Sequence, residues 1–399
     1  MAVTLNETPS ANRLHIGFFG KRNSGKSSLI NAFTNQDVSI VSDVAGTTTD
    51  PVYKAMEVYP LGPCIMIDTA GFDDEGELGQ IRVEKTRLAA EKADVAVVVF
   101  SDLEMEEELE WVCLFQEKKT PVLPIINKAD VLENVEEIRQ KIESATKLVP
   151  IIVSAKQKEG MDRVKEELVR ILPENYGEQF ITGRLVEKGD LVMLVMPQDI
   201  QAPKGRLILP QVQTLRELLD KKALVMSVTT DQFLPCLKVL SQPPKLIITD
   251  SQVFSYIFEN KPKESMLTSF SVLFAAYKGD LPYYVEGAKQ LDALTADSKV
   301  LIAECCTHAP LAEDIGREKI PRMLRQRAEE GITIDVVSGT DYPENLSEYD
   351  LVIQCGACMF NRKYVMSRIE RAKLQQVPMT NYGVVIAHLT GILSQIQLP

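Results

Sequence analysis

The chain has 399 residues, 45% of them apolar and 25% charged, and carries a net charge of −12. This length predicts two or three domains, each with its own core. The acidic balance argues against a nucleic-acid-binding protein, which usually has a basic surface. The N-terminus lacks a secretory signal, and no apolar run reaches the about 18 residues of a membrane helix. We therefore expect a cytoplasmic protein with reduced cysteines and with neither nucleic-acid nor membrane partners.

Short apolar runs alternate with helical stretches between residues 14 and 172. Near-continuous apolar runs are typical of parallel strands that are covered on both faces. The alternation therefore predicts a doubly wound α/β fold with a mostly parallel sheet. The expected strands cover residues 14–19, 64–68, 95–100, 122–127 and 149–154, and the expected helices include residues 80–92 and 135–146.

A phosphate-binding loop (P-loop) is indicated by Gly20-x4-Gly25-Lys26-Ser27, which follows the first expected strand and leads into a helix. The glycines let backbone N–H groups approach the β-phosphate. Lys26 would neutralise charge on the β- and γ-phosphates, and Ser27 would offer its hydroxyl to Mg²⁺.

Three further segments would sense the γ-phosphate and read the base. In DTAG, which ends an expected strand, Asp68 would hold Mg²⁺ through water and the Gly71 N–H would contact the γ-phosphate. In NKAD, the Asp130 carboxylate can accept hydrogen bonds from both guanine N1–H and N2–H, whereas adenine presents a mismatched edge. In SAK, the backbone of Ala155 would contact guanine O6. These segments predict a GTPase that binds GTP and Mg²⁺, not ATP.

The motifs resemble those of the translation-factor-related GTPases, particularly the potassium-responsive branch that contains Era and MnmE. The resemblance implies that Asn23 helps to bind K⁺, although a simple turn role for this residue is the alternative. It also implies that Thr48, in the segment Gly46–Asp50, meets Mg²⁺ together with Ser27. Lys26, Thr48, Asp68 and Gly71 are assigned to hydrolysis. The complete set of expected nucleotide-site residues is Gly20, Asn23, Ser24, Gly25, Lys26, Ser27, Ser28, Thr48, Asp68, Gly71, Asn127, Lys128, Asp130, Ser154, Ala155 and Lys156.

DTAG is followed by Phe72, where a glutamine could orient the attacking water. Hydrolysis is therefore expected to be slow unless a cation, a partner or an acidic residue within 73–75 assists it. A slow GTPase suits a switch better than a motor.

A second group of candidate ligands lies far downstream. Cys306 and His308 follow one expected strand, and Cys355 and Cys358 follow another. If both strands run parallel in one sheet, their carboxyl ends share an edge and the two groups can converge. Three thiolates and an imidazole fit either zinc or an iron–sulfur cluster, and the spacing does not choose between them. Core cysteines without a metal role are the alternative.

Over essentially its whole length the sequence resembles the HydF family, the GTPases of FeFe-hydrogenase maturation. The similarity includes residues 202–220, 314–322 and 338–358. It implies a 4Fe-4S cluster held by three cysteines with an exchangeable fourth position. The implied cysteine ligands are Cys306, Cys355 and Cys358.

The fourth ligand is where this sequence departs from the family pattern. The family often has a histidine directly before the CxxC motif, and Gln354 stands there in this chain. A neutral amide is a poor ligand for iron, so the fourth position falls to His308, to Glu304 or to an exogenous group. Cys305 is interpreted as a structural thiol or a neighbour of the ligands.

The resemblance also implies partners. It describes a scaffold or carrier that receives a diiron precursor and delivers it to apo-FeFe-hydrogenase, with radical-SAM maturation proteins as further partners. It implies a homodimer or a higher oligomer, formed through the small middle unit. An exposed strand edge in that unit could serve this purpose.

We accordingly divide the chain into three α/β domains. These are a GTP-binding domain over residues 1–174, a dimerisation domain over 185–258 and an iron–sulfur domain over 259–399, with 175–184 expected to pack on the last. Beyond residue 184 the expected strands are 190–197, 224–229, 245–250, 299–305, 332–338, 349–355 and 377–381, and the expected helices include 210–223, 264–277, 284–295, 315–329 and 361–375.

Two other functions compete with this hypothesis. A ribosome- or tRNA-associated GTPase with a structural zinc site would need an RNA-binding module and a basic surface, and the sequence indicates neither. A GTP-dependent interaction protein with incidental cysteines is the third possibility.

Overall fold

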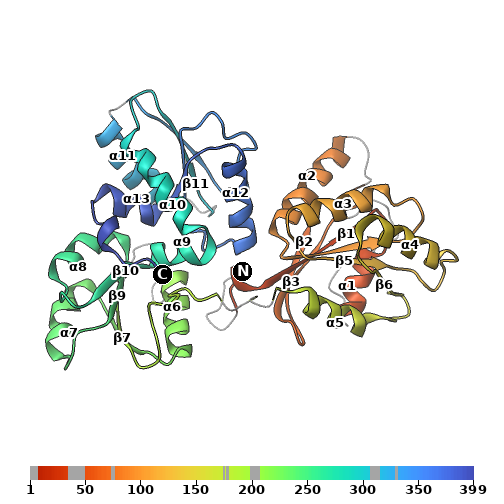
Figure 1. Cartoon of the computed structure of the whole chain (residues 1–399), viewed down its shortest axis with the longest axis horizontal. Helices are drawn as coiled ribbons and strands as arrows, with labels where there is room; N and C mark the ends of the chain where they lie inside the picture. Colours follow the sequence, from red (N-terminus) through yellow and green to blue (C-terminus); the bar gives the residue numbers. More distant parts are fainter. Residues whose placement is uncertain are drawn as a thin grey trace. The chain divides into compact units, whose positions relative to one another are not determined.

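The computed structural model describes residues 8–34, 50–72, 77–173, 176, 179–197, 207–305, 315–328 and 331–399. The chain divides into two compact units, Met1–Tyr176 and Gly177–Pro399 (Figure 1). In the described ranges, none of the helices is long and apolar enough to cross a membrane.

The first unit is a six-stranded sheet in the order β2-β3-β1-β4-β5-β6, with helices on both faces (Figure 1). Neighbouring strands run parallel, except that β2 is antiparallel to β3. The strands are β1 (Leu14–Phe19), β2 (Val52–Val58), β3 (Gly62–Asp68), β4 (Val95–Phe100), β5 (Val122–Ile126) and β6 (Ile151–Ile152). The helices are α1 (Lys26–Thr34), α2 (Glu77–Lys92), α3 (Glu106–Glu117), α4 (Val135–Thr146) and α5 (Met161–Ile171).

Each face of this sheet carries a hydrophobic core. On one face, Ile16 and Phe18 of β1 belong to a buried cluster with Leu29 of α1. On the other face, Phe19 belongs to a cluster with Phe115 of α3. Strands β1 and β4 are buried over their whole length, as expected for central parallel strands.

The sequence analysis did not predict β2, and it predicted a longer β6. Strand β2 is an edge strand, and most of its residues are exposed. It therefore lacks the continuous apolar pattern that marks the buried strands. Strand β6 covers residues 151–152 only. The Val153 N–H still donates to the backbone oxygen of Ile126 at 2.8 Å, and Ser154 then pairs with Glu159 in an isolated bridge.

The second unit contains two four-stranded sheets, in the orders β10-β9-β7-β8 and β12-β11-β13-β14. All neighbouring strands in both described sheets run parallel. The strands are β7 (Leu191–Val195), β8 (Leu224–Val228), β9 (Leu246–Thr249), β10 (Met266–Ser269), β11 (Lys299–Ala303), β12 (Thr333–Val337), β13 (Leu351–Gln354) and β14 (Met379–Asn381). The helices are α6 (Leu209–Asp220), α7 (Phe233–Val239), α8 (Phe254–Asn260), α9 (Phe270–Lys278), α10 (Leu281–Ala288), α11 (Ile320–Ala328), α12 (Arg362–Leu374) and α13 (Tyr382–Leu389).

Helix α9 is buried on two sides within this unit. Val272 and Ala275 belong to the large cluster that includes residues of β11 and β13. Leu273 and Phe274 belong to a second cluster, with residues of β7 and β9. One helix therefore packs in the cores of both sheets.

The helix expected over residues 264–277 is wrong in its first part. Residues Met266–Ser269 form β10, which pairs with β9 in parallel register. Helix α9 starts only at Phe270, where the Ser269 hydroxyl oxygen accepts a hydrogen bond from Val272 N at 3.2 Å. A short apolar strand that runs directly into an apolar helix gives no change of pattern at the boundary.

The segment around residue 182 packs against α6. The backbone N–H of Thr182 donates to Oε1 of Glu217 at 2.9 Å, and the N–H of Ile181 donates to the same carboxylate. Gly183 lies against Pro399. The segment thus contacts both the middle sheet's helix and the final residue.

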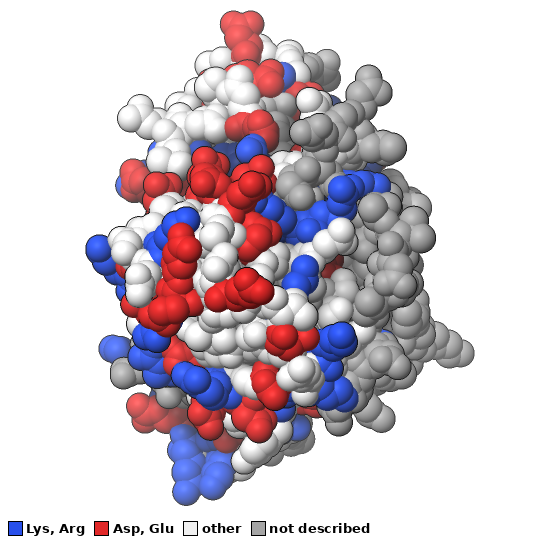
Figure 2. Space-filling view, turned by 90° about the vertical axis from the view of Figure 1, so that its right-hand side faces the viewer, with Lys and Arg blue, Asp and Glu red and all other residues white. Residues whose placement is uncertain are grey.

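The fold-class prediction is confirmed for the GTPase part: a mostly parallel sheet of P-loop type is followed by further α/β structure. Figure 2 shows acidic and basic side chains interspersed over the described part of the face that it presents.

Candidate functional site

The P-loop connects β1 to α1 and has a backbone shape that depends on its glycines. Gly20 and Gly25 have φ angles of 150° and 90°, and a Cβ on Gly25 would lie 2.3 Å from Nδ2 of Asn127. The side chain of Lys26 is buried, and its Nζ donates to the backbone oxygens of Gly20 and Lys21 at 2.8 Å. The loop thus folds around the ammonium group that would meet the phosphates.

Two residues of the expected magnesium site are in direct contact. The Ser27 hydroxyl donates to Oδ2 of Asp68 at 2.6 Å, which joins the start of α1 to the end of β3. The neighbouring Thr69 hydroxyl donates to the backbone oxygen of Phe18 at 2.6 Å and ties the DTAG segment to β1. These bonds place a hydroxyl and a carboxylate together beside the P-loop, as Mg²⁺ binding requires.

Asn127 joins the base-reading segments to the P-loop. Its Nδ2 donates to the backbone oxygen of Ser24 at 3.0 Å, and its Oδ1 accepts from Ala155 N at 3.1 Å. Asp130 accepts a hydrogen bond from the Ser154 hydroxyl at 2.7 Å. Because β1, β5 and β6 are parallel, their carboxyl ends meet at one edge and bring these three segments together.

The remaining expected residues of the nucleotide site are placed as follows. Asn23 is exposed and has a φ of 60°. Ser28 and Lys128 are half-buried, and Lys156 is exposed. Thr48 lies outside the described residues, so its role at Mg²⁺ stays a prediction.

Phe72 belongs to an aromatic stack in the core of the first unit. Its ring centroid lies 5.4 Å from that of Trp111 with an interplanar angle of 11°. The Trp111 ring in turn lies 5.6 Å from Phe19 at 19°. The residue that stands where a glutamine could orient water is thus a packing residue.

The sequence analysis missed a buried carboxyl group beside the P-loop. Glu108 of α3 is 1% exposed, and its Oε2 lies 3.7 Å from Nζ of Lys21. Burial raises the pKa of Glu108 from 4.5 to about 7, against the opposing effects of backbone hydrogen bonding and of Lys21. Lys21 also donates to the backbone oxygen of Glu104, which precedes α3, so α3 and the residues before it hold this part of the loop.

The candidate metal site lies at the carboxyl ends of β11 and β13, which are adjacent parallel strands. The N–H of Cys355 donates to the backbone oxygen of Ala303 at 3.0 Å, which continues the ladder beyond the strands. The N–H of Cys305 donates to Sγ of Cys355 at 3.1 Å. The segments that follow the two strands therefore converge, although they are 50 residues apart in sequence.

The environment of Cys355 fits a thiolate that binds a metal. Its sulfur also accepts a hydrogen bond from Ala357 N at 3.5 Å. Hydrogen bonding from the Cys305 side chain and from these backbone groups lowers the pKa of Cys355, although burial opposes this effect. Burial raises the pKa of the Cys305 thiol well above its ordinary value. N–H donors aimed at a ligand sulfur are a regular feature of iron–sulfur sites.

The other expected ligands are described only in part. Cys358 is half-buried and lies in the same loop as Cys355. Cys306 and His308 lie outside the described residues, so their approach to Cys355 stays a prediction. Within the described ranges, no three His, Cys, Asp or Glu side chains are grouped closely enough to hold a metal ion.

Glu304, a candidate for the fourth position, is engaged elsewhere, whereas Gln354 lies beside the cysteines. The Glu304 carboxylate accepts from Nε of Arg317 at 3.0 Å and from the Tyr382 hydroxyl at 3.3 Å. Gln354 is fully buried at the end of β13, and its Nε2 lies 4.0 Å from Sγ of Cys305. Glu304 would have to leave its ion pair with Arg317 before it could bind iron.

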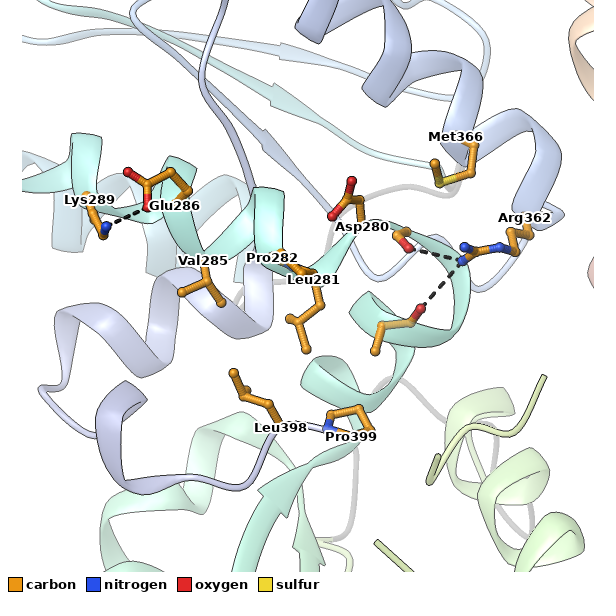
Figure 3. A pocket seen from close by; sticks show the side chains of 12 residues that line it. Asp280, Leu281, Pro282, Val285, Glu286, Lys289, Arg362, Met366, Leu398 and Pro399 are labelled. Carbon is orange, nitrogen blue, oxygen red and sulfur yellow. Dashed lines mark hydrogen bonds and ion pairs between the residues drawn. The ribbon is translucent and has the colours of Figure 1, made fainter. Parts of the chain in front are cut away.

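A cavity of about 630 Å³ lies beside α9, α10 and α12 in the second unit (Figure 3). Arg362 donates from Nη1 to the backbone oxygens of Tyr277 at 2.9 Å and Gly279 at 3.0 Å, and so closes the end of α9. Lys289 donates to Glu286 on the opposite wall. Arg362, Lys289 and Glu286 thus already form hydrogen bonds within the protein.

Three family models match the chain. Residues 15–128 match the 50S ribosome-binding GTPase family, residues 181–279 the hydrogen maturase F dimerization domain, and residues 282–397 the hydrogen maturase F tetramerization domain. The last two together cover more than half of the chain. The prediction of a GTPase domain is confirmed.

Curated relatives that are GTPases resemble part of the chain. GTPase Der of Wolinella succinogenes is 33% identical over 195 residues, which is 45% of this chain and 40% of Der. The tRNA modification GTPase MnmE of Ligilactobacillus salivarius is 37% identical over 128 residues, which is 31% of this chain and 27% of MnmE. The chain thus spans less than half the length of these relatives.

Among solved structures, Era in complex with MgGDPNP and a 16S ribosomal RNA fragment matches 58% of this chain and 98% of its own, at 20% identity and a TM-score of 0.36. The two maturase-specific domains and the GTPase domain decide the assignment: the chain belongs to the hydrogen maturase F (HydF) family.

Proposed function

We propose that this chain is a GTP-hydrolysing scaffold or carrier of FeFe-hydrogenase maturation. It binds a 4Fe-4S cluster and a diiron precursor and delivers the diiron unit to apo-hydrogenase. The observation that carries the proposal is that the segments after β11 and β13, which contain Cys305 and Cys355, meet at one edge of their sheet. Family membership adds weight, because the maturase-specific domains cover this part of the chain.

The nucleotide half of the proposal assigns GTP to the first unit. Guanine is read by Asp130, the phosphates meet Lys26, and Mg²⁺ is held by Ser27 with Thr48. K⁺ binds beside Asn23 and stimulates a slow hydrolysis. The hydrogen bonds of Asn127 to both the P-loop and SAK support a preformed guanine site.

In the metal half of the proposal, Cys306, Cys355 and Cys358 hold the cluster. When bound, the cluster supplies an iron with an exchangeable position for the diiron cargo. Cys305 keeps its proton and donates hydrogen bonds to Cys355. The fourth ligand is His308, Glu304 or an exogenous group, and the ion pair of Glu304 with Arg317 favours the other two.

The proposed partners are apo-FeFe-hydrogenase and the radical-SAM maturation proteins, in the cytoplasm. The dimerization and tetramerization domains assign homo-oligomerisation to the chain. We propose that the domain boundaries are 1–174, 185–258 and 259–399, with the metal site in the last.

One rival function has a specific observation in its favour. The model that matches residues 15–128 is described as a ribosome-binding GTPase, and MnmE is a tRNA modification GTPase. A ribosome- or tRNA-associated GTPase with structural zinc would follow this likeness. The match to the ribosome-binding GTPase family covers residues 15–128 alone, and the net charge of −12 opposes RNA binding.

Anaerobic reconstitution followed by metal analysis, absorbance and EPR tests the proposal. We expect about four iron and four sulfide per chain, a broad band near about 400 nm and a signal from the reduced cluster. The triple variant C306S/C355S/C358S should lose all three, whereas Cys113→Ser, an exposed cysteine in α3, should keep them. A colourless protein with one zinc would support the rival function instead.

A further inference from the structure

A buried lysine holds the cysteine loop, defined as residues 355–361 between β13 and α12. Lys278 is the last residue of α9 and is 2% exposed. Its Nζ donates to the backbone oxygens of Phe360 at 2.6 Å, Ala357 at 3.2 Å and Cys358 at 3.5 Å. An ammonium group has three donors and no acceptor. Carbonyls of this loop therefore satisfy its whole donor set.

A second buried cation lies on the helix that follows the loop. Arg368 of α12 is 1% exposed, and its guanidinium carbon lies 4.6, 4.8 and 4.9 Å from the ring centroids of Tyr342, Phe360 and Tyr364. Its Nη2 donates to the backbone oxygen of Gly339 at 2.5 Å. Its Nε and Nη1 have no hydrogen-bond partner within the described ranges. Aromatic faces attract a cation but bring no formal negative charge.

Among the described residues, neither cation has a carboxylate as a partner. In the part of the chain that the structure describes, no acidic side chain lies within ion-pair distance of Lys278 or Arg368. An isolated buried cation costs several kcal/mol. Among the described residues, Cys355 and Cys358 lie in the loop that Lys278 binds and whose Phe360 ring the Arg368 guanidinium contacts, so their thiolates can offset both charges.

Resting on the cluster-binding function proposed above, we propose that Lys278 and Arg368 are positioning residues of the metal site. Lys278 fixes the cysteine loop through three carbonyl oxygens, and the two cations together offset the negative charge of the thiolate-bound group. Their charges favour the more negative, reduced state of that group and so raise its reduction potential.

This role links the metal site to the middle sheet. Lys278 stands at the end of α9, whose residues pack in the cores of both sheets of the second unit. It also lies within the segment that matches the dimerization domain, whereas the cysteine loop lies within the tetramerization match. A side chain from the segment that matches the dimerization domain therefore binds the cysteine loop, which lies in the segment that matches the tetramerization domain.

The test measures the reduction potential of the reconstituted full-length protein. Lys278→Gln removes the charge but keeps two hydrogen-bond donors, Lys278→Arg keeps the charge, and Arg368→Gln removes the second cation. Lys289→Gln is the matched control, because Lys289 is exposed and pairs with Glu286 on the surface. Iron and sulfide content, circular dichroism and an EPR-monitored redox titration are recorded for each form.

We expect Lys278→Gln and Arg368→Gln each to shift the reduction equilibrium at least tenfold toward the oxidised form. For a one-electron couple this corresponds to a midpoint about 59 mV lower. Lys278→Arg and Lys289→Gln should stay close to wild type. A cluster-loaded Lys278→Gln protein with an unchanged midpoint would overturn the inference.

Two further outcomes are informative. If Lys278→Gln folds but takes up no cluster, uptake by Lys278→Arg supports the need for a cation, and failure of both overturns it. If wild-type protein takes up no cluster, the proposed function fails and this inference fails with it. Failure of the proposed function is distinguished from failure of this inference alone, because in the first case even the wild-type protein lacks the cluster.

Discussion

Glu108 makes the stability of the first unit depend on pH. Burial raises its pKa from 4.5 to about 7, so the folded state binds its proton more tightly than the unfolded state does. Below about pH 4.5 the carboxyl is protonated in both states, and this contribution to stability is complete. As the pH rises from about 4.5 to about 7, the carboxyl ionises in the unfolded state but keeps its proton in the folded state, so the free energy of unfolding falls. Above about pH 7 the buried group ionises too, and the contribution is lost.

We therefore expect Glu108→Gln, which cannot ionise, to remove this pH dependence. Between about pH 5 and about pH 8, wild type should lose up to about 3 kcal/mol of unfolding free energy relative to the variant. Urea unfolding followed by circular dichroism measures the difference. Glu110→Gln, at an exposed position of the same helix, should behave as wild type. Parallel pH profiles for wild type and Glu108→Gln would contradict the assignment.

Phe72 should matter for packing rather than for hydrolysis chemistry. It is 8% exposed and stacks on Trp111. Phe72→Ala should lower the free energy of unfolding by about 3 kcal/mol, because it leaves a cavity in the core. Phe72→Leu keeps most of the volume and should cost less than about 1.5 kcal/mol. Chemical denaturation monitored by far-UV circular dichroism gives both values, and equal losses would refute the cavity argument.

Motif residues were predictable because their chemistry fixes their spacing. Gly25 and Asn127 lie so close together that a Cβ on Gly25 would clash with the Asn127 amide, and the sequence motifs placed both residues in the nucleotide site. Lys278 and Glu108 were not assigned, since a lysine at the end of a helix and a glutamate in an acidic helix usually face solvent. Their burial arises from partners 79 and 87 residues away, such as Ala357 and Lys21.

The exposed edge strand β8 is the element on which we expect dimerisation to depend. It lies at one end of its sheet, and Leu224 is 57% exposed. A charged residue on an edge strand blocks pairing with another chain. Leu224→Lys should therefore shift the sedimentation of the protein from dimer to monomer with unchanged circular dichroism. Thr333→Lys, on the edge strand β12 of the other sheet, is the control that should keep the dimer. A Leu224→Lys dimer of wild-type affinity would exclude β8 from the interface.

Elements were predictable where burial gives a continuous apolar run. Strands β1 and β4 have the bounds that the sequence indicates. Strand β2 was missed because it is exposed, and β10 because its apolar run merges with that of α9. In both cases the partner strand, rather than the local pattern, decides the structure.

At the scale of the whole molecule, nucleotide state is expected to control cofactor delivery. The hydrogen bond between Ser27 and Asp68 must rearrange when Mg²⁺ and GTP bind. We expect the segment 46–50, which contains Thr48, and the segment 71–79, which follows DTA, to act as switch loops that carry this change onward. Lys26→Ala and Asp130→Ala should therefore mature apo-hydrogenase at least about tenfold less well than wild type. Their cluster content should stay the same, because the residues proposed to bind the cluster belong to the other unit. Full maturation activity in both variants would exclude this coupling.

Trp111 is the single tryptophan of the chain, and it stacks with both Phe19 and Phe72. Phe72 directly follows Gly71, whose N–H would meet the γ-phosphate. A displacement there alters the surroundings of the indole, so intrinsic emission of the native protein would track GTP and GDP exchange without a dye. In a homo-oligomer every subunit contributes one identical emitter, which would make stopped-flow traces of nucleotide exchange directly readable.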